Sequence, residues 1–345
     1  MEQERRSIRI GLAAIICAVF IQLLSSGVPQ AVAAFLTTPE AASFILYLET
    51  GRVFRITGAE TQPQPTQETE EPTQPQPEQP QQEDPEPQRA VFSAEDATLL
   101  KVQNNTRYPF KAEQWLTQPL NWDLTQEEPT VLILHTHTTE SYTQTEGYDY
   151  QESSKYRCLD EDYNMNRVGS FLAQLLRQQG ISVLHDTTIH DYPSYTGSYN
   201  ASRKTAQAYL EEYPSICLIL DLHRDALETQ SGKQLSTHTT VNGVSTAQLM
   251  LVVGTDAGGL KHPQWEQNMA LAVKLHAQLE KNAPGICRPI SFRSQRFNQD
   301  LCPGTLLVEV GAAGDSFPEA LAAAQILAQA ITDLAQGAES ADSTS

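Results

Sequence analysis

The sequence has few cysteines, and none of them has the spacing of a thiolate metal site. No C-x-x-C pair or other close zinc-finger spacing occurs among the five. Cys17 and Cys217 lie in apolar runs and are expected to be small buried side chains. If the chain is exported, two of the remaining three could form a disulfide, and the sequence does not choose the pair: Cys158, Cys287 and Cys302.

Basic side chains are also scarce. The chain has 23 Lys and Arg against 42 Asp and Glu, for a formal net charge of -19. Binding to a phosphate backbone depends on basic side chains that release counterions, so the absence of a Lys/Arg cluster excludes nucleic acid as a partner. Much of the acidity belongs to one Pro/Gln-rich stretch, which holds Glu60, Glu68, Glu70, Glu71, Glu78, Glu83, Asp84 and Glu86.

Two common catalytic motifs are missing as well. Ser141 follows Glu140, but no G-x-S-x-G elbow surrounds it, which argues against a serine nucleophile. The glycine-rich segment VGTDAGGLKH lacks the Lys-Ser/Thr ending of a phosphate-binding loop. We therefore look for chemistry elsewhere in the chain.

The amino end carries a basic flank followed by an apolar run. Arg5, Arg6 and Arg9 precede Ile10–Leu24, in which only Gln22 is clearly polar. This pattern fits a segment inserted with its amino end in the cytoplasm. An Ala-x-Ala-like group at Ala31–Ala34 keeps a cleaved signal open as the alternative. Either way, we expect the rest of the chain to be exported, and we favour a single-pass anchor in the cell membrane.

Composition divides the chain into five parts. The Pro/Gln/Glu-rich part cannot bury a core, and its charge keeps it extended, so it is expected to space the later domain from the membrane. A proline-rich recognition sequence is the competing interpretation. The parts are a cytoplasmic tip and transmembrane anchor (1–35), a juxtamembrane segment (36–58), a disordered linker (59–94), a catalytic domain (95–338) and a disordered tail (339–345).

Apolar runs alternate with helical patterns in the part expected to be folded. This alternation predicts an α/β domain with a parallel sheet covered on both faces. Asn242-Gly243 between Thr/Val-rich segments predicts a hairpin. Strands are expected at 131–134, 181–184, 216–222, 248–253 and 305–310, and helices over 168–179, 201–212, 263–281 and 317–335.

Polar residues follow or end three of these strands. The first runs into His135-Thr-His137-Thr-Thr-Glu140, the second into His223-Arg224-Asp225, and the third contains Glu309. Ligands of open α/β sheets bind beyond the carboxyl ends of the strands. Two imidazoles and one carboxylate with an open fourth position form a common catalytic zinc shell, and a further carboxylate can serve as general base. The sequence therefore predicts a metal hydrolase.

The individual signals differ in strength. Glu309 lies inside LLVEVG, where an unpaired carboxylate would be costly to bury. Asp221 or Asp225 could accept the second ring N–H of His223, and Arg224 is the natural group to pair with a substrate carboxylate. The other histidines are interpreted as ordinary solvated or capping residues: His185, His190, His238, His262 and His276.

Four ordered motifs carry a resemblance to a known family. HTHTTESY, LDLHRDA, VVGTDAGGLKHPQWEQN and FNQDLCPGTLLVEVG, spread over about 125–335 behind the apolar amino end, resemble the stage II sporulation protein P family. The resemblance implies a mixed, mostly parallel sheet with helices on both faces, similar to the zinc-dependent N-acetylmuramoyl-L-alanine amidases. It implies peptidoglycan as substrate, with cleavage of the amide between muramic acid and the stem peptide, and an endopeptidase activity on cross-linked stems.

The resemblance also implies a site, a place and partners. A histidine of the H-T-H group, Glu140 and His223 would bind Zn2+, with Glu309 as the base; of His135 and His137 we favour His135, which lies directly at the strand end. Members of the family act in engulfment from the mother-cell membrane facing the forespore, with stage II sporulation proteins D and M. The alternatives are a zinc peptidase acting only on stem peptides and a non-catalytic wall-binding scaffold.

Overall fold

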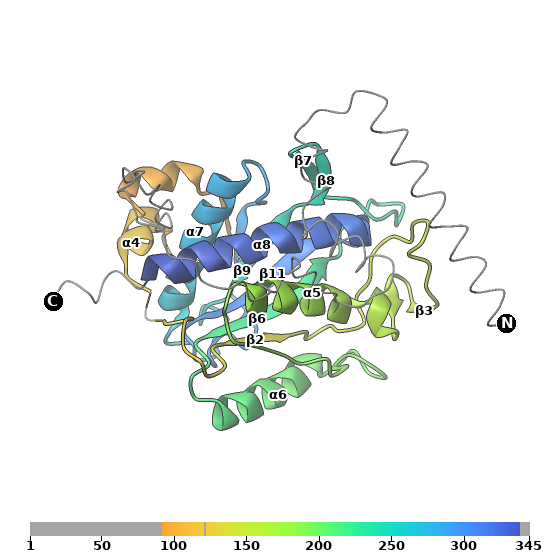
Figure 1. Cartoon of the computed structure of the whole chain (residues 1–345), viewed down its shortest axis with the longest axis horizontal. Helices are drawn as coiled ribbons and strands as arrows, with labels where there is room; N and C mark the ends of the chain where they lie inside the picture. The colour runs from red at the N-terminus through yellow and green to blue at the C-terminus, as the bar shows by residue number, and fades with distance from the viewer. Residues whose placement is uncertain (1–91, 121, 339–345) are drawn as a thin grey trace, which may run out of the picture. The chain divides into compact units, whose positions relative to one another are not determined.

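A computed structural model describes residues 92–120 and 122–338 (Figure 1). The predicted anchor, juxtamembrane segment and tail lie outside these residues, as does all but the end of the predicted linker. In the part of the chain that the structure describes, no helix has the length and apolar character needed to cross a membrane.

The described residues include one seven-stranded sheet with the order β1-β10-β9-β11-β6-β2-β5. Only the pair β9–β11 is antiparallel, so the sheet is mixed and mostly parallel, as the resemblance implied. Its strands are β1 (Val102–Asn104), β2 (Val131–Leu134), β5 (Val183–His185), β6 (Leu218–Asp225), β9 (Leu249–Val253), β10 (Ile290–Phe292) and β11 (Thr305–Ala312).

The one antiparallel pair divides the sheet into two halves. Strands β11, β6, β2 and β5 run in one direction, and β9, β10 and β1 run in the other. The carboxyl ends of β2, β6 and β11 therefore meet at one edge of the sheet. Every residue of β2 is buried, which is typical of a parallel strand covered on both faces.

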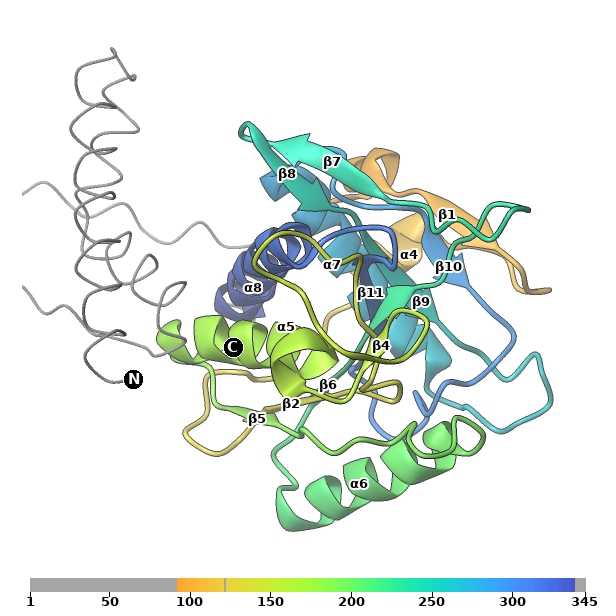
Figure 2. The same cartoon turned by 90° about the vertical axis from the view of Figure 1, so that its right-hand side faces the viewer.

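Helices cover both faces of the first half. Side chains alternate along a strand, so Leu132 and Leu134 point to one face, where they form a cluster with Ala206 of α6 (Ser198–Glu212). The opposite face carries α5 (Met165–Gln178), which lies across β2 from α6 (Figure 2). Helix α8 (Phe317–Ala338) contacts both α5 and α7 (Trp265–Asn282).

The longer elements agree with the sequence prediction. Helix α5 buries the predicted apolar face, including Phe171 and Leu172, and is capped by the Asn164 side chain, which accepts the backbone N–H of Asn166. Strands β7 (His238–Val241) and β8 (Val244–Ala247) form the predicted hairpin. Asn242 and Gly243 take the positive φ values of 50° and 83° that a tight hairpin turn requires.

Short elements were not predicted. They are η1 (Ala94–Leu99), α4 (Ala112–Thr117), β3 (Glu152–Ser154), β4 (Arg157–Cys158), η2 (Glu161–Tyr163), β1 and β10. Segments this short carry too few periodic positions to separate them from loops. The suggested disulfide is also corrected, because the cysteines of the described residues, Cys158, Cys217, Cys287 and Cys302, are all free.

Candidate metal centre

His223 and Glu309 lie side by side on neighbouring strands. The two residues are direct partners in the register of β6 and β11, so their side chains leave the same face of the sheet, with the strands about 4.8 Å apart. Oε2 of Glu309 is buried and has no hydrogen-bond partner. Burial raises the pKa of Glu309 to about 8, a value that the nearby His223 would oppose.

The His223 ring lies between two carboxylates. Nδ1 is 3.4 Å from Oε2 of Glu140, and Nε2 is 3.0 Å from Oδ1 of Asp221, although that contact lacks the angle of a regular hydrogen bond. Burial opposes protonation of the ring, but Asp221 and Glu140 outweigh it and raise the His223 pKa well above its usual value. Asp221, two residues earlier on the same strand, is thus the partner foreseen for the second ring nitrogen; Asp225 instead pairs with Arg288 at 2.8 Å.

Glu140 turns back from its loop toward His223. Its carboxylate accepts hydrogen bonds from Nη2 of Arg157 and from the backbone N–H of Arg224, both at 3.3 Å. Burial would raise the pKa of Glu140, yet Arg224 and His223 together lower it to about 2. The group is therefore an ionised carboxylate held beside an imidazole.

His137 completes this cluster. Its ring meets the His223 ring edge to face, with centroids 5.2 Å apart, and stacks on Tyr195 at 4.4 Å. Nδ1 of His137 is buried and has no hydrogen-bond partner. Burial lowers the His137 pKa to about 4, which keeps the ring neutral, the form that binds a metal ion.

His135 lies elsewhere, and the preference for it as the ligand is corrected. Its Nδ1 is 3.1 Å from the Leu222 carbonyl, and its Nε2 is 2.9 Å from Nε2 of His185. Side chains continue to alternate past Leu134, so the His135 ring lies on the face covered by α5. There, a Cβ added to Gly169 would lie 2.5 Å from Nε2 of His135 and 2.5 Å from Nε2 of His185. The structure brings His137, not His135, to Glu140 and His223.

The substrate-binding role expected of Arg224 is corrected as well. Its side chain is 4% exposed. Nε donates to the Ser141 carbonyl at 2.9 Å and Nη2 to the Tyr156 carbonyl at 2.8 Å, while Nη1 lies 3.5 Å from Oε1 of Glu140. The guanidinium is engaged inside the protein, where it holds the Glu140 loop in place.

The cluster fits a divalent metal ion in its chemistry. Two buried polar atoms without hydrogen-bond partners belong to this cluster, His137 Nδ1 and Glu309 Oε2, while His223 Nε2 faces Asp221 and Nδ1 faces Glu140. Buried polar atoms are normally paired, so their convergence indicates a missing ligand, and imidazole and carboxylate are ligands that zinc accepts. Among the described residues, His137, Glu140 and His223 do not have ligand atoms that all lie within 4.8 Å of one another. Their side chains would therefore move closer together around a bound ion.

Several residues of the site escaped the sequence reasoning. Arg157 donates to Asp191 as well as to Glu140, and its guanidinium carbon lies 5.0 Å from the ring centroid of Tyr195. Tyr195 is 57% exposed and covers His137, and Tyr199 meets the same ring edge to face. These residues come from β4, from the loop before α6 and from the start of α6, and no local spacing links them to the H-T-H group.

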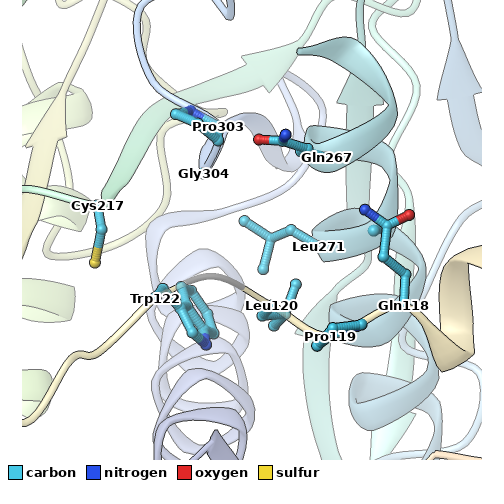
Figure 3. Close-up of a pocket in the computed structure, with 10 residues that line it drawn as sticks. Gln118, Pro119, Leu120, Trp122, Cys217, Gln267, Leu271, Pro303 and Gly304 are labelled. Atoms are coloured by element: carbon cyan, nitrogen blue, oxygen red, sulfur yellow. The ribbon is translucent and has the colours of Figure 1, made fainter.

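A pocket of about 100 Å³ lies at the opposite edge of the sheet (Figure 3). Its wall includes Trp122, Leu271 of α7, and Cys217 and Gly304, which precede β6 and β11. Cys217 is the one titratable group among the lining residues, and burial raises its pKa to about 11. The pocket is thus separate from the strand ends that carry His223 and Glu309.

Comparison with known sequences gives one family and one curated relative. A family model described as Stage II sporulation protein P matches residues 40–332. Stage II sporulation protein P of Bacillus subtilis (strain 168) is 28% identical over 233 residues, which is 64% of this chain and 55% of the relative. The chain therefore spans about half the length of the curated relative it matches.

Solved structures that this chain resembles in fold include N-acetylmuramoyl-L-alanine amidases. AmiC2 of Nostoc punctiforme is 15% identical to this chain, with a TM-score of 0.33. The match covers 59% of this chain and 94% of the AmiC2 chain. The amidase of Clostridium difficile 630 is 13% identical with a TM-score of 0.35, and covers 60% and 94%.

Proposed function

Since the family model covers most of its length, the chain belongs to the stage II sporulation protein P family, and from this premise we propose that it is a zinc-dependent N-acetylmuramoyl-L-alanine amidase. The substrate would be peptidoglycan, degraded during sporulation. The proposal includes an endopeptidase activity on cross-linked stem peptides.

One observation carries the proposal. His223 lies beside Glu309 in the strand register, beside the His137 ring and 3.4 Å from the Glu140 carboxylate, and buried atoms of His137 and Glu309 have no hydrogen-bond partner. We assign His137, Glu140 and His223 as the Zn2+ ligands, because each presents a ligand atom of the right chemistry at this place. Glu309 is left as the base.

The roles of the side chains follow from their contacts. Bound zinc would polarise the scissile carbonyl and lower the pKa of a water molecule. Oε2 of Glu309 would take the proton of the attacking water and pass it to the leaving amine. The positive charge of a bound zinc ion would oppose the burial that raises the Glu309 pKa and would favour the ionised form that a base needs. Asp221 would hold the His223 ring, and is itself held by the backbone N–H and hydroxyl of Thr136 at 2.7 and 2.6 Å.

Location and partners belong to the same proposal. The basic flank and apolar run at the amino end support a single-pass anchor with the catalytic part outside the cytoplasm. Family membership supports action from the mother-cell membrane facing the forespore, together with stage II sporulation proteins D and M.

Digestion of purified peptidoglycan tests the activity. The full chain should release stem peptides with a free L-alanine amine, and a chelator should stop the release until zinc is restored. Mass analysis separates the rivals: a peptidase would cut the stems and leave L-alanine on the glycan, whereas a scaffold would release nothing. Release that continues unchanged in His223→Ala would refute the assigned site.

A further inference from the structure

A second group of metal-ligating side chains lies on α7 and in the loop that precedes β10. Ligand atoms of His276, Glu280 and Cys287 all lie within 4.8 Å of one another. The three residues are buried, with 0%, 8% and 3% of their surfaces exposed. None of them belongs to the candidate metal centre at the ends of β2, β6 and β11.

The fold explains how these three residues come together. His276 and Glu280 are four residues apart on α7, so their side chains share one face of the helix. The helix ends at Asn282, and the chain turns at Gly285, where φ is 87°. The backbone of Cys287 then pairs with Leu249 at the start of β9 in an isolated β-bridge. This pairing brings the Cys287 side chain back to α7. Wide cysteine spacing had argued against a thiolate site, but this one needs a single cysteine.

His276 provides the second observation that indicates a ligand. The residue is completely buried, and neither of its ring nitrogens makes a regular hydrogen bond, although the Leu99 backbone lies near enough to favour the protonated ring slightly. Burial lowers the His276 pKa to about 4, so the ring is neutral and offers a lone pair. A buried imidazole without a regular hydrogen bond is costly in free energy, and a metal ion bound to it would remove that cost.

Glu280 and Cys287 are already held in position. Oε2 of Glu280 accepts the N–H of Gly285 at 3.0 Å, and Oε1 accepts the N–H of Cys287 at 2.8 Å. The carboxylate is therefore fixed beside the thiol before any ion binds. Each oxygen keeps a further lone pair, because each accepts one hydrogen bond in this loop.

We propose that His276, Glu280 and Cys287 form a structural zinc site that ties the carboxyl end of α7 to the β10 side of the sheet. The charges balance: Zn2+ contributes two positive charges, the Glu280 carboxylate and the Cys287 thiolate one negative charge each, and the imidazole none. The thiol proton leaves to solvent as the S–Zn bond forms. Burial is therefore compatible with the bound ion, whereas an unbalanced charge would be expelled.

The geometry requires only a small closure. Zinc binds these ligand atoms at about 2.0–2.3 Å, which separates them by roughly 3.5 Å in a tetrahedron. The ligand atoms already lie within 4.8 Å of one another, so small side-chain rotations reach that value. The fourth position of the tetrahedron would be open to a water molecule. Lys101, whose Nζ is 3.9 Å from Oε2 of Glu280, has a half-exposed side chain and can point away to solvent.

Cobalt substitution of the full chain tests the site independently of the catalytic proposal. Thiolate bound to Co2+ gives an intense near-ultraviolet charge-transfer band, and the metal centre of His137, Glu140 and His223 contains no thiolate. We expect the band in the unaltered chain and in His223→Ala, and its loss in Cys287→Ser. Cys302→Ser, which changes another buried cysteine, is the matched control and should keep the band.

Zinc titration supplies a second readout that does not depend on cobalt. Cys287→Ser and His276→Gln should each bind one zinc ion fewer per chain, with peptidoglycan cleavage retained. Excess zinc should raise the Tm of His223→Ala but not that of the double variant His223→Ala/Cys287→Ser, in which both sites are removed. If Cys287→Ser does not fold, His276→Gln decides, and zinc affinity at this site should fall at least tenfold. No band in the cobalt-loaded chain, or a band that survives in Cys287→Ser, would overturn the site while leaving the amidase proposal intact.

Discussion

The two faces of the sheet differ, at the ends of β2, β5 and β6, in the partners that their histidine rings have. On the α5 face, His135 and His185 contact each other, the Leu222 carbonyl and the Ser170 hydroxyl through their four ring nitrogens. On the α6 face, His137 has a buried nitrogen without a hydrogen-bond partner, and His223 lies between two carboxylates, next to an unpaired oxygen of Glu309. The type of partner thus separates histidines that stabilise the fold from those available for chemistry, although His135 and His137 belong to the same motif.

The largest expected effect comes from the unpaired carboxylate. Glu309→Gln should slow amide cleavage by about 10²- to 10⁴-fold, because the amide cannot act as a base. The Tm should stay the same or rise, since the substitution removes a group whose charge is disfavoured by burial. Rate measurement on purified sacculi and thermal unfolding check the two parts. If Glu309→Gln lost the rate and also showed a large drop in Tm, Glu309 would have a structural role instead.

Replacing each histidine of the H-T-H group by alanine in turn tests this comparison most directly. His135→Ala should destabilise the fold by about 1–3 kcal/mol, because it leaves His185 and the Leu222 carbonyl without a partner. His137→Ala should leave stability nearly unchanged and lose zinc from the metal centre. Chemical denaturation and metal analysis of both variants, measured together, provide the check. The reverse pattern would restore His135 as the metal ligand.

The packing of α5 against the satisfied pair can be tested through its glycine. Gly169→Ala would place a Cβ 2.5 Å from Nε2 of both His135 and His185, and should cost about 1–3 kcal/mol of stability. Ser170→Ala, one residue away and at an exposed hydrogen bond, is the matched control and should cost much less. Denaturant unfolding measures both. A neutral Gly169→Ala would mean that α5 can shift away from the strand end.

The effect that is smallest at neutral pH is a dependence of stability on pH. Burial lowers the pKa of His135 to about 4 and that of His185 to about 3, so the unfolded chain binds more protons than the folded one as pH falls below 6.5. Stability from this pair is complete above pH 6.5 and declines toward pH 4. His185→Gln should reduce the slope over this window by at most about 1.4 kcal/mol per pH unit. An unchanged slope would assign the pH dependence to other histidines.

The strand ends of the site could be predicted because buried apolar runs are strong signals. VLIL, ICLILDL and TLLVEV gave β2, β6 and β11, and their parallel order brought His223 next to Glu309. The choice between His135 and His137 depended on where the chain leaves the strand. Alternation puts His135 on the face of Val131 and Ile133, opposite the face of Asp221 and His223, and only the turn at 136–139 brings His137 to the His223 ring.

The residues that surround the site could not be found in this way. Arg157 reaches Glu140 from β4, a two-residue strand without a periodic pattern. Tyr195 reaches His137 from the loop before α6, and its stacking depends on where that loop crosses the strand ends. Residue type alone also gave a wrong prediction for Arg224. An arginine at a strand end suggested a contact to substrate, yet the guanidinium is buried and donates to the backbone carbonyls of Ser141 and Tyr156.

The antiparallel junction of β9 and β11 changes which loops can act together. Because β9, β10 and β1 run against the other strands, the segments that enter these strands border the same rim as the segments that leave β6 and β11. Arg288, just before β10, reaches Asp225 at the end of β6 without crossing the sheet. Sequence changes in entering and leaving loops can therefore reshape one shared rim, a freedom that a uniformly parallel sheet, with its two kinds of loop on opposite rims, does not offer.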